Sequence, residues 1–154
     1  NCILYQCLKV IGVSLRWLQV VWGGSCNGFA VKSFSNSTEF AEKHGAEQPQ
    51  NAVFIARKPT GEVYDTDLAN QFPERDWILS RILWLSGLEE GFNRGEGCDT
   101  YQRYIYIHGT PDSEPMGMPM SHGCIRMRNT DVIELFELID CNALVYISEH
   151  KLEI

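Results

Sequence analysis

One segment of this 154-residue chain has the clear periodicity of an amphipathic helix, and it constrains the fold more than any other feature. Its apolar residues recur at i, i+3, i+4 and i+7, at Val132, Leu135, Phe136 and Ile139. Asn129 or Thr130 can cap this helix, and Asp131 suits the positive end of the helix dipole in the first turn. A chain with one such helix must build most of its core from strands.

The second half of the chain contains three apolar runs that favour strands. Tyr104–Ile107 has strong β propensity and delivers His108 at its end. Trp77–Leu85 carries apolar residues on both faces and is rich in isoleucine and tryptophan, so we expect a buried strand there rather than a helix. Leu144–Ile147 predicts a final strand. The expected fold class is mainly β (α+β), with one substantial helix directly after the loop that contains Cys124.

The first half of the chain is less regular. Leu15–Trp22 and Phe29–Phe34 are separated by a glycine-rich break and together indicate a hairpin. Ser35–Gln50 is polar, and we expect a loop or an irregular turn there. We then expect a short strand, a turn and a second strand, at Ala52–Ala56, Pro59–Gly61 and Glu62–Tyr64. With no repeat and no linker, residues 1–154 are expected to form a single domain.

The charge and hydropathy of the chain argue against two classes of partner. The formal net charge is −7 and the pI is about 5.0, and no stripe of lysine and arginine could neutralise a phosphate backbone. We therefore expect no nucleic acid partner. No apolar run reaches the roughly 18 residues of a membrane span, so no membrane span is expected. No signal peptide is evident at Asn1.

The cysteine pattern favours reduced thiols and no metal. Six cysteines are spaced irregularly and form no C-x-x-C pair, and a chain of this length can build a core without disulfides. His108, His122, Cys98 and Cys124 are zinc-ligand types, but their spacing fits no common zinc pattern. We therefore expect no bound metal.

His108 and Cys124 together favour nucleophilic catalysis. Singly, a cysteine between glycine and isoleucine is more often a small buried hydrophobe, and a histidine closing a strand is more often structural. A thiol becomes nucleophilic when a nearby imidazole removes its proton, and His108 would occupy a rigid position for such a base. The backbone carbonyl of Gly109 could orient the imidazole in place of a carboxylate.

The residues around Cys124 suggest how the rest of a site would be built. Gly123 has no side chain, so the backbone can approach a substrate carbonyl there. The N–H groups of Gly123 and Cys124 could then form an oxyanion hole. Arg126, two residues later, could bind a substrate carboxylate through two parallel hydrogen bonds.

His108, followed by Ser121-His122-Gly123-Cys124-Ile125-Arg126, resembles the signature of the YkuD-type L,D-transpeptidase catalytic domain. The resemblance extends from about Pro59 to Ile147. It implies a YkuD-like β-sandwich or barrel and a bacterial enzyme that acts on peptidoglycan tetrapeptide stems. The family usually carries a Thr-Pro-x-Gly segment after its first hairpin, whereas Ser33–Ala46 has no proline.

The resemblance also implies roles for individual residues. Cys124 would attack the carbonyl between the diamino acid at stem position three and the terminal D-alanine, with His108 as the base and the Gly109 carbonyl as its anchor. His122 and Gly123 would join Cys124 in framing the oxyanion. Two further residues would position the substrate, Ser121 and Arg126. The family needs no metal or organic cofactor and is typically sensitive to carbapenems.

Three functions remain open at this level. Transfer of the thioester to an amine on another stem gives a 3→3 cross-link, whereas transfer to water makes the protein an L,D-carboxypeptidase. A non-catalytic wall-binding module is the third and is disfavoured by the presence of His108, Gly123 and Cys124 together. We expect the enzyme in the periplasm or cell envelope if a leader has been removed, and in the cytoplasm otherwise.

Overall fold

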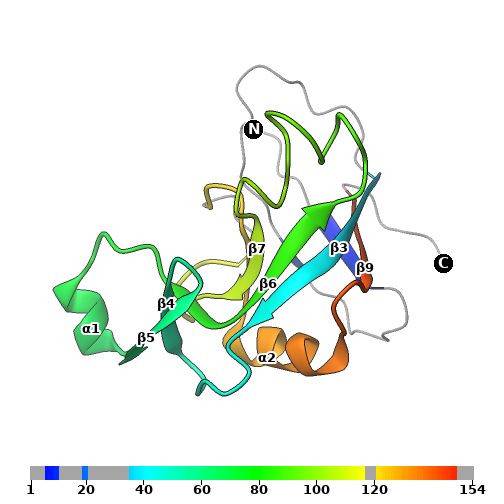
Figure 1. Ribbon diagram of the computed structural model, residues 1–154. Helices are drawn as coiled ribbons and strands as arrows, with labels where there is room; N and C mark the ends of the chain where they lie inside the picture. The colour runs from blue at the N-terminus through cyan, green and yellow to red at the C-terminus, as the bar shows by residue number, and fades with distance from the viewer. Residues whose placement is uncertain (1–5, 11–18, 21–34, 117–120, 149–154) are drawn as a thin grey trace.

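The computed structural model describes residues 6–10, 19–20, 35–116 and 121–148, and nine strands within them form one sheet. Along its main path the strand order is β2-β1-β9-β3-β6-β4-β5, with β7 joined to β6 and β8 joined to β7 (Figure 1). The strands of the first half are β1 (Gln6–Val10), β2 (Gln19–Val20), β3 (Ser35–His44), β4 (Ala52–Ile55) and β5 (Lys58–Val63). Those of the second half are β6 (Ile78–Gly87), β7 (Tyr106–Gly109), β8 (Ile125–Met127) and β9 (Leu144–Ser148). The helices are α1 (Thr66–Gln71) and α2 (Asn129–Leu138).

Strand β6 is the centre of the sheet. Its two edges pair with three strands, because β3 and β4 bond to successive parts of one edge and β7 bonds to the other. Eight of its ten residues are buried, from Leu79 to Leu85 and at Gly87. The expectation of a buried strand over Trp77–Leu85 is therefore confirmed, as is the mainly β fold with one substantial helix after the Cys124 loop.

The expectation of a loop over Ser35–Gln50 is wrong, because its first ten residues form β3. This strand is antiparallel to both β6 and β9. Thr38 and Phe40 are buried on it, and the Thr38 hydroxyl donates to the Val145 carbonyl at 3.3 Å. Pairing on both edges overrides the low β propensity of the polar residues.

The β4–β5 hairpin turns earlier than expected. The turn residues are Ala56 and Arg57, whose φ values are 47° and 69°, and Ile55 pairs with Lys58 across it. Two residues with positive φ are typical of the tight type I′ hairpin turn. The predicted turn at Pro59–Gly61 lies inside β5 instead, where proline is tolerated because β5 is an edge strand.

The remaining elements match the expectations in part. β9 confirms the final strand, and α2 confirms the helix, while the short helix α1 was not anticipated. Phe29–Phe34, one arm of the hairpin predicted near the N-terminus, lies outside the described residues. So does most of the other arm, Leu15–Trp22, of which Gln19–Val20 pairs with β1.

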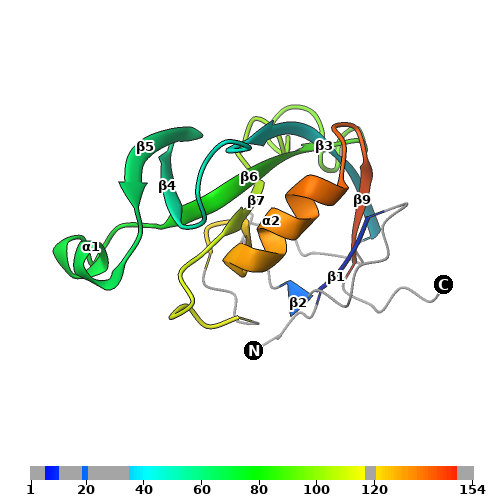
Figure 2. The same cartoon turned by 90° about the horizontal axis from the view of Figure 1, so that it is seen from below.

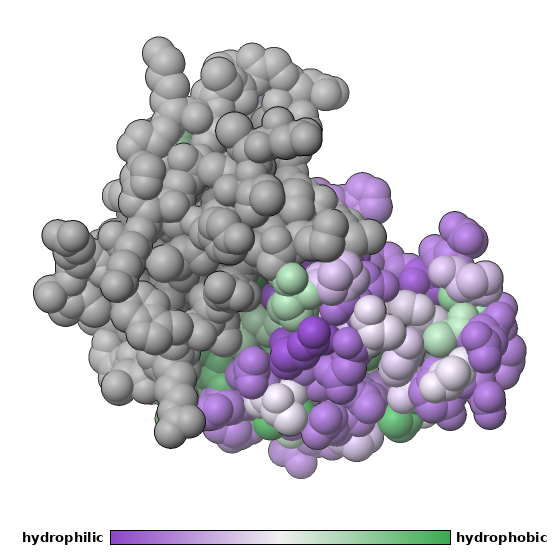
Figure 3. Space-filling model, turned by 180° about the vertical axis from the view of Figure 1, so that it is seen from behind, coloured by the Kyte–Doolittle hydropathy of each residue, from purple (hydrophilic) through white to green (hydrophobic). Residues whose placement is uncertain are grey.

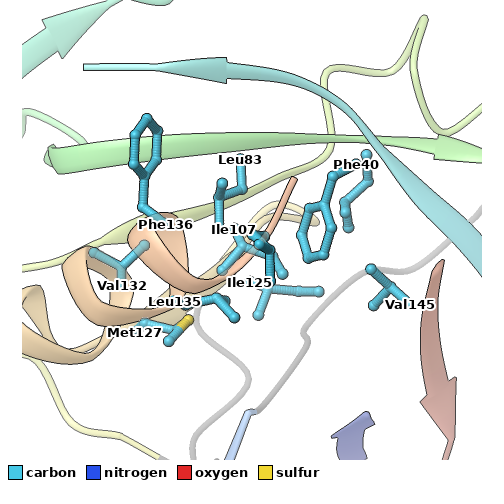
Figure 4. Packing of buried hydrophobic residues seen from close by; sticks show 11 residues of the cluster. Phe40, Leu83, Ile107, Ile125, Met127, Val132, Leu135, Phe136 and Val145 are labelled. Atoms are coloured by element: carbon cyan, nitrogen blue, oxygen red, sulfur yellow. The ribbon is translucent and has the colours of Figure 1, made fainter. Parts of the chain in front are cut away.

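Helix α2 covers one face of β6 and β7, and the main hydrophobic core lies between them (Figures 2 and 4). The helix contributes Val132, Leu135 and Phe136, which are at most 5% exposed. The strands contribute Phe40, Leu83, Leu85, Ile107, Ile125, Met127 and Val145. One side of β7 and β8 is thereby sealed by apolar packing.

The two helices among the described residues are 6 and 10 residues long. Within these residues, neither helix is long and apolar enough to cross a bilayer. The face in Figure 3 is largely hydrophilic where it is described, with small hydrophobic areas among the hydrophilic residues.

Candidate active site

The register of β7 and β8 brings the two predicted catalytic residues onto one face. The strands are parallel, with Ile107 opposite Ile125 and His108 opposite Arg126. Side chains alternate along a strand, so Cys124, two residues before Arg126, projects from the same face as His108. Ile107 and Ile125 project from the opposite face, into the core beneath α2.

The His108 ring is oriented by a backbone oxygen. It is 1% exposed, and its Nδ1 atom lies 2.7 Å from the Gly109 carbonyl oxygen. Because a carbonyl can only accept, Nδ1 must carry the proton, and Nε2 is left with a free lone pair. Burial lowers the pKa of His108 below its usual 6.5, which outweighs the opposing effects of the Gly109 carbonyl and the Asp76 carboxylate. The ring is therefore a neutral base at neutral pH.

Gly109 is fixed by close packing that no other residue would allow. A Cβ atom there would lie 2.3 Å from Oδ1 of Asn129 and 2.6 Å from the Leu79 carbonyl oxygen. The Asn129 side chain donates to the Thr110 carbonyl at 2.9 Å and accepts from the Ser80 hydroxyl at 2.6 Å. This buried network ties the start of α2 to β6 and β7 directly behind the carbonyl that holds the imidazole.

The Asn129 contacts also correct the predicted helix cap. Neither Asn129 nor Thr130 caps α2, because Arg128 is the N-cap and makes no capping hydrogen bond through its side chain. Asn129 is 3% exposed and directs its amide into the protein instead. Asp131 does lie in the first turn, as expected.

A hydrogen bond and a raised pKa both favour the protonated form of the Cys124 thiol at neutral pH. Its Sγ atom donates to the Tyr104 carbonyl oxygen at 3.4 Å, and the described contacts include no hydrogen bond from it to the His108 ring. Burial raises the pKa of Cys124 above its usual 9.0, although the Tyr106 backbone N–H and Arg126 act in the opposite direction. These shifts favour a neutral cysteine and a neutral histidine at neutral pH, so a thiolate would form only by loss of the thiol proton.

Tyr104, whose carbonyl accepts the hydrogen bond from the Cys124 thiol, has an unusual backbone conformation. Its φ is 58°, a value that is uncommon outside glycine, and it lies in a turn before β7 begins at Tyr106. The predicted strand Tyr104–Ile107 is therefore confirmed only in its second half. His108 lies inside β7 rather than closing it.

The Ser121 hydroxyl stabilises the loop that carries Cys124. It donates to the Cys124 carbonyl oxygen at 2.7 Å and accepts from the Gly123 N–H at 3.4 Å. Gly123 has a φ of 138°, which favours glycine at this position, and it is buried, whereas His122 is exposed. The contacts of Ser121 are therefore with the loop backbone, and the Gly123 N–H predicted for the oxyanion hole has a partner at a long distance.

Arg126 is engaged by two carboxylates of the protein itself. Its Nη2 atom lies 3.1 Å from Oδ1 of Asp76, and its Nη1 atom lies 3.5 Å from Oε2 of Glu114. A substrate carboxylate would have to compete with both, so the contacts of this side chain do not favour its predicted use in substrate binding.

Asp76 also acts on the two predicted catalytic residues. Its charge acts to raise the pKa of both His108 and Cys124, and no sequence motif indicated that this residue lies near them.

An aromatic cluster lies beside Cys124 on the same face. Trp84 stacks on Tyr101 with ring centroids 3.9 Å apart and contacts Tyr106 edge-on at 5.6 Å. Cys124 packs against this cluster. Trp84, Tyr106 and the Tyr104 carbonyl thus all lie around Cys124.

Arg57 covers this cluster and was not predicted as a functional residue. Its guanidinium carbon lies 4.6 Å from the Trp84 ring centroid and 4.9 Å from that of Tyr104. Nη1 donates to the Tyr106 hydroxyl at 2.9 Å. The short β4–β5 turn positions Arg57. In the sequence, only a correct prediction of that turn could have pointed to this residue.

Potential metal ligands do not cluster within the described residues. No group of three or more histidine, cysteine, aspartate or glutamate side chains among them could hold a metal ion. The cysteines whose side chains are described are free thiols, at positions 98, 124 and 141.

Comparison with known proteins gives a family match over most of the chain. A family model for YkuD, described as the L,D-transpeptidase catalytic domain, matches residues 30–147. The "Putative L,D-transpeptidase YqjB" of Bacillus subtilis (strain 168) is 44% identical over 47 residues, which are 30% of this chain and 27% of that relative. The matched segment thus spans about a quarter of the relative's length. No solved structure gave a significant match.

Proposed function

This chain belongs to the YkuD family of L,D-transpeptidase catalytic domains, and on that premise we propose that it transfers the acyl group of a peptidoglycan tetrapeptide stem through a thioester on Cys124. The observation that carries the proposal is the neutral His108 ring, oriented on the Gly109 carbonyl and projecting from the same face as the thiol. A buried base with one free ring nitrogen, on the same face as a protonated thiol, is suited to general-base catalysis.

In the first half-reaction, Nε2 of His108 takes the thiol proton while Sγ of Cys124 attacks the carbonyl between the diamino acid and the terminal D-alanine. The thiol first leaves its hydrogen bond to the Tyr104 carbonyl. The C–N bond then breaks, His108 returns the proton to the departing D-alanine nitrogen, and the acyl group remains on sulfur as a thioester.

Backbone donors of the loop would stabilise the oxyanion. The N–H of Gly123 is held by the Ser121 hydroxyl at 3.4 Å, a long and therefore weak hydrogen bond that a developing negative charge can replace. The stronger bond from Ser121 to the Cys124 carbonyl, at 2.7 Å, would keep the loop in place meanwhile. Exposed His122 lies at the same loop and could approach the substrate.

The second half-reaction resolves the thioester. A side-chain amine of another stem loses a proton to His108 and attacks the thioester carbonyl, which forms a 3→3 cross-link and regenerates the thiol. Attack by water in the same step would release a tripeptide instead. Cross-linking is the proposed main outcome, and stem trimming is the result that would replace it.

One incubation separates these outcomes. Purified protein with a disaccharide tetrapeptide should release D-alanine and form a dimer, detected by chromatography with mass spectrometry. Release of D-alanine with tripeptide and no dimer would assign an L,D-carboxypeptidase. No D-alanine at all would leave a non-catalytic wall-binding module. In parallel, meropenem should form a covalent adduct on Cys124 and on no other thiol.

A further inference from the structure

Arg57 is held over the aromatic cluster from the tip of the β4–β5 hairpin. Its planar guanidinium lies over Trp84 and Tyr104, and its Nη1 donates to the Tyr106 hydroxyl at 2.9 Å. Stacking on two rings and one hydrogen bond fix the plane of the group. The side chain is therefore preorganised.

The turn that carries Arg57 is not one its sequence favours. Both turn residues, Ala56 and Arg57, have positive φ, where asparagine and glycine are preferred. A left-handed conformation costs roughly 1–2 kcal/mol per non-glycine residue, so contacts elsewhere must offset it. The interactions of Arg57 with the aromatic cluster can offset this conformational cost.

Arg57 retains donors that these contacts do not use. A guanidinium has five N–H groups, and Tyr106 accepts from one of them. Among the described residues no carboxylate forms an ion pair with Arg57, although Glu42 is near enough to act on its charge. Arg126, in contrast, is paired with Asp76 and Glu114.

The same residues connect Arg57 to the nucleophile. The Cys124 thiol donates to the Tyr104 carbonyl, while Arg57 lies over the Tyr104 ring. Cys124 also packs in the cluster formed by Trp84 and Tyr106, both of which contact Arg57. A substrate atom bound to Arg57 would thus lie close to the reacting carbonyl.

We propose that Arg57, rather than Arg126, binds a carboxylate of the acyl donor beside Cys124. This inference rests on the proposed function for the identity of the donor. A tetrapeptide stem offers carboxylates near the scissile bond from two sources, the terminal D-alanine and the side chain of diaminopimelate. Both present the planar pair of oxygens that a guanidinium binds with two parallel hydrogen bonds.

Binding and turnover are measured separately to test this. The Cys124→Ala protein binds donor without reacting, so calorimetry gives its affinity for three donors: the tetrapeptide, the same peptide ending in D-alaninamide, and the peptide with lysine in place of diaminopimelate. Each is compared with Arg57→Gln, Arg57→Lys and the control Arg94→Gln, whose own ion pair with Glu90 is exposed at 3.9 Å. Thermal unfolding of every variant confirms that it is folded.

Arg57→Gln should weaken binding of the unmodified tetrapeptide by about 10- to 100-fold, as expected for hydrogen bonds to a charged group. The loss should shrink to within about threefold for whichever donor lacks the recognised carboxylate, and Arg57→Lys should recover part of the affinity. Arg94→Gln should change nothing.

An equal loss for all three donors would show that Arg57 only supports the hairpin, and that would overturn the inference. No loss, or no binding of any donor to the Cys124→Ala protein, would overturn it as well. Turnover of the wild-type protein is a separate readout. If binding depends on Arg57 but no D-alanine is ever released, the proposed function fails while the carboxylate site stands.

Discussion

Strands β7 and β8 present two faces of opposite character, although alternate residues of the same short segments form them. Toward α2 they place Ile107, Ile125 and Met127, which are at most 2% exposed. Toward the other side they place His108 and Cys124 among polar partners and aromatic rings. Alternation of side chains along a strand thus keeps an apolar core within one residue of a reactive pair. Changes on one face should affect stability and those on the other should affect chemistry.

The largest expected effect on the reactive face is that of Cys124→Ser. The change keeps the shape but loses the thiolate, so D-alanine release should fall by on the order of 10⁴-fold or more, as for loss of other catalytic nucleophiles. The unfolding midpoint should stay close to that of the wild type, as urea titration would show. Turnover that survives the change would exclude Cys124 as the nucleophile.

His108→Gln should reduce kcat/KM by about 10²- to 10⁴-fold, the usual effect of removing a general base. Glutamine has a side chain of similar reach but offers no basic nitrogen at neutral pH. Steady-state assays at pH 7 check this, and meropenem should still acylate Cys124, although more slowly. A rate near that of the wild type would transfer the role of base to His122.

On the opposite face, Leu135→Ala should have the reverse effect, a loss of stability with little change in rate. Leu135 is fully buried between α2 and the sheet, so its truncation should lower the free energy of unfolding by about 2–5 kcal/mol. The rate per folded molecule should change little, because no reacting group contacts Leu135. Urea unfolding and active-site titration measure the two quantities; a large loss of rate without loss of stability would contradict the division into two faces.

The smallest expected effect is a shift in the pH dependence of kcat/KM. Because the pKa of His108 is lowered by burial, the acid limb of kcat/KM should have its midpoint below 6.5, the usual value for histidine. A depressed pKa also contributes stability that is present above the unfolded value of 6.5 and is lost as the pH falls through the folded value. The wild type should therefore lose stability on acidification more steeply than His108→Gln.

Alkylation of Cys124 gives the matching alkaline measurement. Burial raises its thiol pKa above 9.0, so reaction with iodoacetamide should accelerate only in alkaline solution. The opposite result would be a thiolate already formed at neutral pH, together with an acid limb of kcat/KM whose midpoint lies at or above 6.5. Cys124 and His108 would then be an ion pair rather than two neutral groups.

The sequence predicted elements whose pattern is local. The helix after Cys124 follows from its 3.6-residue period, and β6 follows from a dense apolar run. β3 was missed because ten mostly polar residues become a strand only through β6 and β9, which come more than thirty residues later. The β4–β5 turn was misplaced because Ala56 and Arg57 are poor turn residues, whereas Pro59–Gly61 has the composition of a turn.

The candidate site divides in the same way. The pair of His108 and Cys124 and the anchor at Gly109 could be named from a short motif, and their register follows from the pairing of β7 and β8. Asp76 and Arg57 could not, since each comes from a distant segment and gains its place only through tertiary contacts. The ion pairs of Arg126 with Asp76 and Glu114 could not be predicted either, because these carboxylates lie 50 and 12 residues from it in the sequence.

The main-chain oxygen that holds the His108 ring has a genetic consequence. No codon specifies this atom, so no single nucleotide change can delete it as it could delete an aspartate or asparagine in the same place. A mutation can displace this oxygen only indirectly, by adding a side chain at position 109 or by removing the Asn129 amide behind it. Nor does it titrate in the range where proteins stay folded, so acidity can charge the imidazole but cannot remove the acceptor that holds it.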